Sequence, residues 1–172
     1  MLTTSDNFNR FNQHSFSLTI PKLPSVTDYA QSTAIPGMTL GEALTGTPFV
    51  DRKEPGDKII FSVLSITCVA DEELKLWKEC FDWISSLGFP ESYSQYGRLS
   101  QGNTIVSGED AFCDGVLTIY NNQQSPILRI NIRDMFPIAV SEINLATNDS
   151  GDESTSFVID LQYRSYEVDI II

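Results

Sequence analysis

Residues 55–84, PGDKIIFSVLSITCVADEELKLWKECFDWI, join a long apolar run to an amphipathic segment through three consecutive acids. In the apolar run, Ile59 and Phe61 share one side, and from Leu64 onward the alternation changes side. Because the side chains of a strand alternate strictly, this change of phase indicates a bulge or a strand covered on both faces. The run 58–70 also exceeds the usual strand length of about 3–10 residues, so we expect it to continue beyond its own sheet.

The second half of this stretch predicts one helix over residues 71–87. Asp71 is a favourable N-cap, and the two glutamates after it lie in the first turn, where the helix dipole stabilises anions. Gly88 and Pro90 end the helix. Its apolar residues fill about half of the circumference and predict core packing, also for the two tryptophans, rather than a ligand cage. They are Leu74, Leu76, Trp77, Cys80, Phe81, Trp83, Ile84 and Leu87.

The rest of the chain predicts antiparallel strands. Alternation typical of half-buried strands occurs over residues 15–20, 116–120, 127–134 and 157–163. Residues 135–145 contain Pro137, so this segment starts a strand or lies at a sheet edge. The last strand changes phase after Tyr163. One helix cannot cover both faces of such a sheet, so we expect an α+β fold, mainly β with one flanking helix, built as an antiparallel β-sandwich or barrel.

The 172 residues, 41% of them hydrophobic, suit a single domain over 1–172. Residues 1–13 are polar and predict an N-terminal arm. Residues 36–57 hold four glycines and three prolines, which is too many for a helix. A loop this long is uncommon in a compact domain unless it has a function. We therefore expect residues 38–57 to reach onto another subunit.

Residues typical of catalytic or metal sites are scarce. His14 is the single histidine, and the three cysteines Cys68, Cys80 and Cys113 stand far apart, as expected of reduced, buried thiols rather than zinc ligands. Residues 148–153, NDSGDE, bring oxygen ligands together but lack the spacing of a calcium loop, which favours an acidic turn. We expect no catalytic residue, no cofactor and no metal.

The net charge is −12, from 11 basic and 23 acidic residues. This disfavours ordinary nucleic-acid binding, which needs clustered Lys and Arg. Two interpretations remain: the charge keeps the protein soluble, or it belongs to a surface that must not hold nucleic acid. The sequence has no run of eighteen apolar residues and does not begin like a secretory signal. We therefore expect assembly in a cytoplasm and no membrane contact.

The order of these motifs resembles the tail-tube proteins of contractile-tailed bacteriophages, with the T4-like tube fold. AIPG at residues 34–37 precedes the punctuated loop, residues 55–84 follow, and RDMFPIAVSEINLATNDSGDESTSFVIDLQYRSYEV lies at 133–168. The most telling parts are Asp71-Glu72, Asp82-Trp83 at the end of the helix, and Phe136-Pro137 followed by Ser141-Glu142-Ile143.

The resemblance implies a β-sandwich or barrel with one flanking helix. It also implies hexameric rings whose sheets join into a cylinder, stacked through the loop 38–57 into a tail tube that ejects DNA past an acidic wall. Residues 86–112 and the arm do not align with the plain tube protein. The alternative is therefore a tube-end protein of the same fold (baseplate tube initiator, tail terminator, or tail completion protein), or the tube of a related injection system.

The implied partners are further copies of the chain, the tail sheath, the baseplate hub, the tape measure protein and the terminator; DNA passes through without specific binding. The implied location is the virion tail. We expect the loop 38–57 to stack rings and the strand edges in 58–70 and 157–168 to pair laterally. The predicted interface residues are Pro36, Gly37, Leu44, Pro48, Phe49, Ile60, Leu64, Ile66, Phe136, Pro137, Phe157 and Ile159. A monomer with a filled pocket would favour a ligand-binding barrel instead, and an enzyme is the third class.

Overall fold

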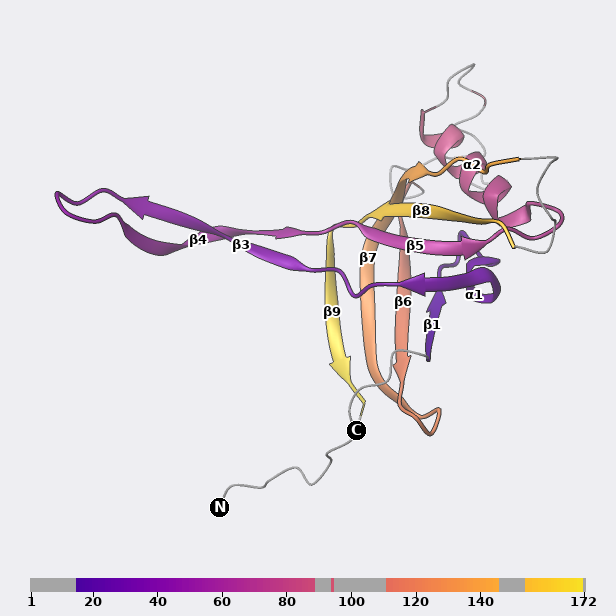
Figure 1. Cartoon of the computed structure of the whole chain (residues 1–172), viewed down its shortest axis with the longest axis horizontal. Coiled ribbons are helices and arrows are strands. Elements are labelled where there is room, and N and C mark those ends of the chain that lie inside the picture. The colour runs from indigo at the N-terminus through magenta and orange to yellow at the C-terminus, as the bar shows by residue number, and fades with distance from the viewer. Residues whose placement is uncertain (1–14, 89–93, 95–110, 146–153, 172) are drawn as a thin grey trace.

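The computed structural model describes residues 15–88, 94, 111–145 and 154–171 (Figure 1). The elements follow in the order β1 (Phe16–Thr19), α1 (Val26–Tyr29), β2 (Ala30–Thr33), β3 (Met38–Thr45), β4 (Arg52–Phe61), β5 (Leu64–Val69), α2 (Lys75–Gly88), β6 (Cys113–Tyr120), β7 (Pro126–Val140), β8 (Ser156–Gln162) and β9 (Ser165–Ile170).

Seven strands form one antiparallel sheet in the order β1-β6-β7-β8-β5-β2, with β9 paired to β7. The long strand β7 serves both halves of it: residues 128–133 pair with β9, and residues 136–140 pair with β8. In Figure 1, the antiparallel strands β1, β6, β7 and β9 are all roughly vertical, and β2, β5 and β8 cross them. We call the group β1-β6-β7-β9 the first sheet and the group β2-β5-β8 the second sheet.

The expected fold class is confirmed as a mainly antiparallel β structure with helices on its flank. In the described part of the chain the sheet does not close into a barrel, because its path ends at β1 and at β2. The sandwich form is therefore right and the barrel form is wrong. Most of the core lies between the two sheets, with Leu18, Ile66, Ile130 and Ile159 among the fully buried residues.

The two predicted phase changes mark places where the chain leaves one sheet for another. The run 58–70 is split into β4 and β5 at Ser62 and Val63, so it contains a break rather than a bulge. The last run breaks in the same way after Gln162, before β9 begins. In contrast, the two strands predicted around residues 127–145 are one strand, β7.

Strand β7 bends where it passes from one sheet to the other. Asp134 adopts a positive φ of 53°, and the register with β8 shifts between Pro137 and Ala139. Beyond this bend β8 is the one strand paired to β7 in the described chain. Pro137, which has no N–H to donate, therefore lies at a sheet edge, as predicted.

Helix α2 begins later than the sequence predicts. Leu74 has a positive φ of 50°, and its carbonyl accepts the first helical hydrogen bond, from Lys78 N–H at 2.9 Å. Asp71 Oδ2 accepts from Lys75 N–H at 3.2 Å. Asp71 therefore does cap the helix, but from four residues before its first turn. The structure also contains a second, one-turn helix, α1, which the sequence analysis missed.

The face of α2 that packs against β7 differs in part from the predicted one. Trp83 is buried and its Nε1–H donates to the Ala111 carbonyl at 3.3 Å, which confirms its place in the core. Phe81 is instead exposed and stacks on Trp77 with 5.5 Å between ring centroids. Ser86, which is not among the predicted core residues of the helix, is buried, and its hydroxyl donates to the carbonyl of Asp82.

The cysteines behave as expected for structural thiols. Cys68 and Cys80 are buried, Cys113 is half-buried, and all three are free. Burial raises the pKa of Cys68 and of Cys80 to about 12. Neither thiol forms the reactive thiolate near neutral pH.

Candidate assembly surfaces

Strands β3 and β4 form a hairpin that projects far from the body of the molecule (Figure 1). The prediction of a loop over 38–57 is therefore wrong: the segment is an ordered two-stranded ribbon, paired from Met38 opposite Phe61 to Thr45 opposite Arg52. The strands β2 and β5, which lead into it and out of it, are also paired with each other. The ribbon thus prolongs the edge of the second sheet into solvent.

The glycines of the ribbon allow its strands to pair around an irregularity. The register shifts between Leu40 and Glu42, where β4 contains extra residues. A Cβ added to Gly56 would lie 2.6 Å from the carbonyl oxygen of Gly41, which is closer than such atoms approach. A Cβ added to Gly41 would meet no described atom closer than 3.7 Å. Only Gly56 is thus required for the close backbone contact.

Large apolar side chains are exposed along both faces of the ribbon. Met38, Leu40 and Ile59 share one face, because Met38 pairs with Phe61 and Leu40 pairs with Ile59. Ile60 is exposed on the opposite face, and Phe49 near the tip is 95% exposed. Exposed apolar surface is typical of interaction sites, and an isolated hairpin is only marginally stable in water.

The base of the ribbon is fixed to the break between β8 and β9 by aromatic packing. The ring of Phe61 lies 5.8 Å from that of Tyr163 and 5.3 Å from that of Tyr166. Tyr163 Oη donates to the carbonyl of Ser62 at 2.7 Å. Burial raises the pKa of Tyr163 to about 12. We call this base the hairpin root.

Two residues predicted for the interface belong to the hairpin root instead. Pro36 is buried, and its carbonyl accepts a hydrogen bond from Tyr166 Oη at 3.0 Å. The carbonyl of Gly37 accepts from Ser62 N–H at 2.9 Å. Both residues orient the ribbon. Of the other residues predicted there, Leu44, Pro48, Phe49 and Ile60 are exposed on it.

Of the strand edges predicted to pair laterally, the parts in β5 and β8 are enclosed, whereas residues 165–168 belong to the edge strand β9. Strand β5 lies between β2 and β8, and β8 lies between β5 and β7, so neither has a free edge. Their side chains Leu64, Ile66, Phe157 and Ile159 are fully buried in the subunit's own core. Pro137 is buried too, and Phe136 is half-buried against Phe112, with 5.8 Å between ring centroids.

Within the described residues, the first sheet has open edges at β1 and β9, each with one neighbour. The range 157–168 predicted to pair laterally includes the start of β9, but no edge was predicted at β1, because alternation shows which strands are half-buried and not which strands are their neighbours. One signal was present: the apolar residues that follow the last phase change. Val168 and Ile170 of β9 are 49% and 69% exposed, although they pair with Ile130 and Leu128 in the core-facing row of the sheet.

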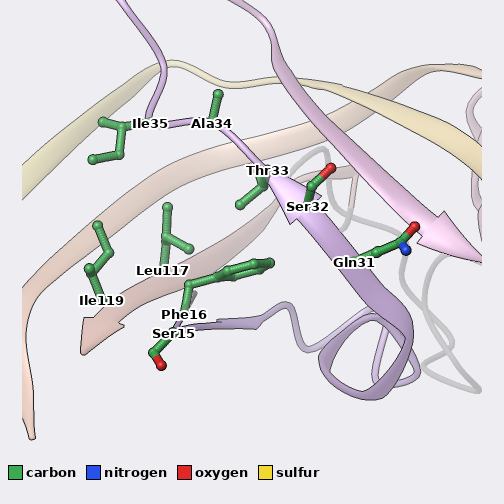
Figure 2. Close-up of a pocket in the computed structure, with 9 residues that line it drawn as sticks. All are labelled: Ser15, Phe16, Gln31, Ser32, Thr33, Ala34, Ile35, Leu117 and Ile119. Carbon is green, nitrogen blue, oxygen red and sulfur yellow. The ribbon is translucent and has the colours of Figure 1, made fainter. Parts of the chain in front are cut away.

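An apolar groove of about 450 Å³ lies beside the edge strand β1 (Figure 2). Phe16 of β1 and Leu117 and Ile119 of β6 contribute from the first sheet. Figure 2 shows them below the segment 33–35, which joins β2 to the ribbon. The remaining residues that line it are Ser15, Gln31, Ser32, Thr33, Ala34 and Ile35.

The other face of the first sheet is polar. Arg133 forms an ion pair with Glu167 at 2.9 Å, and Asn131 Nδ2 donates to Asp169 at 2.8 Å, both between β7 and β9. Arg129 pairs with Asp169 in the same ladder. The four charged side chains of β7 and β9 on these rungs, two arginines and two acids, balance each other.

Two of the weighed candidates for chemistry, His14 and residues 148–153, lie outside the described residues, as does the predicted arm. Among the residues that the structure describes, no group of three His, Cys, Asp or Glu side chains could hold a metal ion. The described helices include none long and apolar enough to cross a membrane.

Comparison by sequence gives one informative relative. No family model matches the chain. The tail tube terminator protein of Enterobacteria phage T4 is 22% identical over 173 aligned residues, which cover 94% of this chain and 90% of that protein. The similarity thus runs through almost the whole of both chains.

Comparison of structures extends this to injection systems. The tube-terminating cap of the anti-feeding prophage is similar with a TM-score of 0.61 at 12% identity, covering 99% of this chain and 100% of that one. The sheath/tube terminator of the extracellular contractile injection system PVC gives 0.62 at 12%, covering 94% and 97%. A chain of the PVC sheath-tube complex gives 0.58 at 13%, covering 95% and 94%. The resemblance read from the sequence is confirmed, and the chain has the fold shared by the tail-tube and tube-end proteins of contractile tails and injection systems.

Proposed function

We propose that the protein is a structural, non-enzymatic component of the tail tube of a contractile tail, located at the tube end, where copies of it form a ring. The similarity to a tail tube terminator over 94% of the chain supports the tube end. The similarity to the cap of the anti-feeding prophage and to the PVC terminator supports the same position. The repeating tube subunit is the second candidate, favoured by the similarity to a chain of a sheath-tube complex.

The observation that carries the ring is the pair of open edges on the first sheet. All its neighbouring strands are antiparallel, so β1 and β9, three positions apart, run in opposite directions. Strand β9 of one copy can therefore pair antiparallel with β1 of the next without reversing either subunit. A head-to-tail contact of this kind closes into a ring or grows into a filament.

The width of the first sheet fits a channel. Four strands spaced about 4.8 Å apart span about 19 Å per copy. Six copies would give a circumference of about 115 Å, and hence a cylinder about 35–40 Å across between backbones. Barrels with many strands leave an aqueous channel of this kind.

We place the polar face of the first sheet toward this channel. The resemblance implied an acidic wall, but Arg129 and Arg133 balance Glu167 and Asp169 there. The net charge of −12 therefore gives no support to an acidic wall at these rungs. Acids are instead frequent before and within α2, from Asp71 to Asp82, which favours the solubility interpretation of the charge.

The projecting ribbon is proposed to reach onto another subunit of the ring or onto an adjacent tube protein. Its exposed apolar side chains lack a partner within the described part of the chain. Sheath, baseplate hub, tape measure and terminator contacts stay predictions, as does passage of DNA without specific binding. The location that follows is the virion tail, after assembly in the host cytoplasm.

The test is the assembly state of the purified protein, measured by light scattering after size exclusion and by negative-stain microscopy. Isolated rings, about 80–100 Å wide for six small domains around a pore, that attach to the ends of tail tubes are the expected result. Long tubes of this protein alone would favour the repeating subunit. A monomer at all concentrations, with no attachment to tubes, would contradict the proposal.

A further inference from the structure

We propose that the apolar groove beside β1 is completed by Val168 and Ile170 from strand β9 of a second copy of this chain. This rests on the proposed function, because it assumes that copies join edge to edge. It goes further in naming the two side chains that enter the groove and the groove residues that receive them.

One wall of the groove is formed by a row of core-facing side chains of the first sheet. Phe16 pairs with Ile119, and Leu18 pairs with Leu117. These four side chains therefore point to the core-facing side of the sheet, while Ser17 and Thr19 point to the polar side. Leu18 is covered by the core, but the row ends at Phe16 in an open groove.

The opposite edge of the first sheet, β9, carries exposed apolar side chains. Val168 and Ile170 lie in the same core-facing row, opposite Ile130 and Leu128. They are 49% and 69% exposed, because the described part of the second sheet does not extend over that end of β9. One edge thus offers uncovered apolar side chains and the other an apolar groove.

Strand pairing brings the two together on the correct face. When a strand is added to a sheet, its side chains stay in phase with those directly opposite, so core-facing residues meet core-facing residues. Addition of β9 from one copy to β1 of the next therefore places Val168 and Ile170 beside Phe16, at the edge of the groove. A shift of register by two residues keeps this face, whereas a shift by one would place acids in the groove.

The other occupants fit less well. The chain's own ribbon leaves the body on the side of β9, away from β1 (Figure 1), so it projects away from this groove. A small apolar molecule would fit the volume of about 450 Å³, but it would leave both the backbone edge and the β9 side chains uncovered. A second copy would fill the groove, pair with the backbone edge of β1 and cover the side chains of β9.

The first experiment compares the double variant Val168→Ser/Ile170→Ser with Ile138→Ser. Ile138 is the control, because it is 48% exposed but lies on β7, which is not an edge strand of the first sheet. The dissociation constant of ring assembly is measured by mass photometry and sedimentation. We expect the double variant to assemble at least about tenfold more weakly, since two apolar side chains lose their burial, and the control to assemble like the unmodified chain.

The second experiment places the photo-crosslinking residue benzoylphenylalanine at position 170 in a mixture of ¹⁴N- and ¹⁵N-labelled chains. Crosslinks between differently labelled chains at residues 15–16, 31–35 or 117–119 are expected, and the reagent does not need an exact register. Crosslinks confined to one chain, or to other segments, would overturn the inference. So would a small molecule bound to the unmodified ring in native mass spectrometry and lost when Ile35→Asp is introduced.

Ring formation and the filling of the groove by Val168 and Ile170 are tested separately. If the unmodified protein forms no ring, the proposed function fails and the inference with it. If rings form and the Val168→Ser/Ile170→Ser variant assembles as tightly as the unmodified protein, only the inference fails.

Discussion

Tyr163 and Ser62 are 101 residues apart in the chain, yet the tyrosine hydroxyl donates a 2.7 Å hydrogen bond to the serine carbonyl. Tyr163 stands at the break between β8 and β9, and Ser62 stands at the break between β4 and β5. The contact thus joins two of the places where the chain changes sheets. It makes the direction of the projecting ribbon depend on the first sheet, whose edges we propose to form the ring.

Removal of this hydroxyl should loosen the hairpin root. In Tyr163→Phe the part-buried hydrogen bond to the carbonyl of Ser62 is lost, and we expect the free energy of unfolding to fall by about 1 kcal/mol. Urea denaturation measures it. Tyr120→Phe is the control, because the Tyr120 hydroxyl makes no hydrogen bond within the described residues and should change stability little. Equal losses in both variants would contradict a specific role for Tyr163.

The same residue predicts a pH dependence. Burial raises the pKa of Tyr163 to about 12 from its ordinary value of 10, so between these values the folded chain keeps a proton that the unfolded chain has released. The stabilisation is therefore complete below pH 10 and is lost as the pH rises toward 12. The stability difference between the unmodified protein and Tyr163→Phe should be constant up to about pH 10 and shrink above it. A difference that grows above pH 10 would contradict the assignment.

Gly56 and Gly41 should differ in their tolerance of a methyl group. Gly56→Ala places a Cβ 2.6 Å from the backbone of β3, whereas Gly41→Ala finds ordinary contact distances. We expect Gly56→Ala to separate β3 from β4 and to speed amide exchange over residues 38–61 by at least about tenfold. Exchange in the core strands should stay unchanged. Gly41→Ala should keep the protection, and similar exchange in both variants would show that the strands separate for another reason.

The apolar ribbon should matter for assembly more than for stability. Because Phe49 is 95% exposed and Ile60 is also exposed, replacing both by serine should change the free energy of unfolding by no more than about 0.5 kcal/mol. Association with tube ends or with further copies should weaken at least about tenfold, as measured by mass photometry. Thr39→Ser, on the same ribbon, is the control and should associate normally. Normal association of the double variant would show that the ribbon is not a contact surface.

The balanced charges of the polar face give a prediction about DNA. Glu167→Gln with Asp169→Asn leaves Arg129 and Arg133 unopposed on the face proposed for the channel. Rings of this variant should retain DNA in a salt-sensitive manner, unlike rings of the unmodified chain, because two uncompensated arginines attract phosphates. Filter binding over a range of salt concentrations measures it.

The control for this prediction removes the same charge elsewhere. Glu72→Gln with Glu73→Gln changes the net charge by the same amount near the start of α2, far along the chain from the first sheet. We expect its rings not to retain DNA. Equal retention by both variants would mean that the face of β7 and β9 does not line the channel.

The sequence by itself determined the local features of this protein. The apolar alternation located β1, β5, β6, β8 and much of β7, but neither β2 nor β3. The changes of phase before Leu64 and after Tyr163 coincide with two breaks between sheets. The spacing of Trp83 and its neighbours identified α2, because a helix places every third or fourth residue on one side. These features follow from the periodicity of the backbone, which acts over a few residues.

The tertiary structure alone decided which strands are neighbours, and hence where the assembly surfaces lie. Ile66 and Ile159 were predicted at an interface but are enclosed, whereas Ile170, which the sequence did not single out, is uncovered on the edge strand β9. Alternation reports that a strand has one apolar face and does not identify the strand that pairs with it. That pairing depends on contacts between residues up to about a hundred positions apart, such as Tyr163 with Ser62, which no local pattern records.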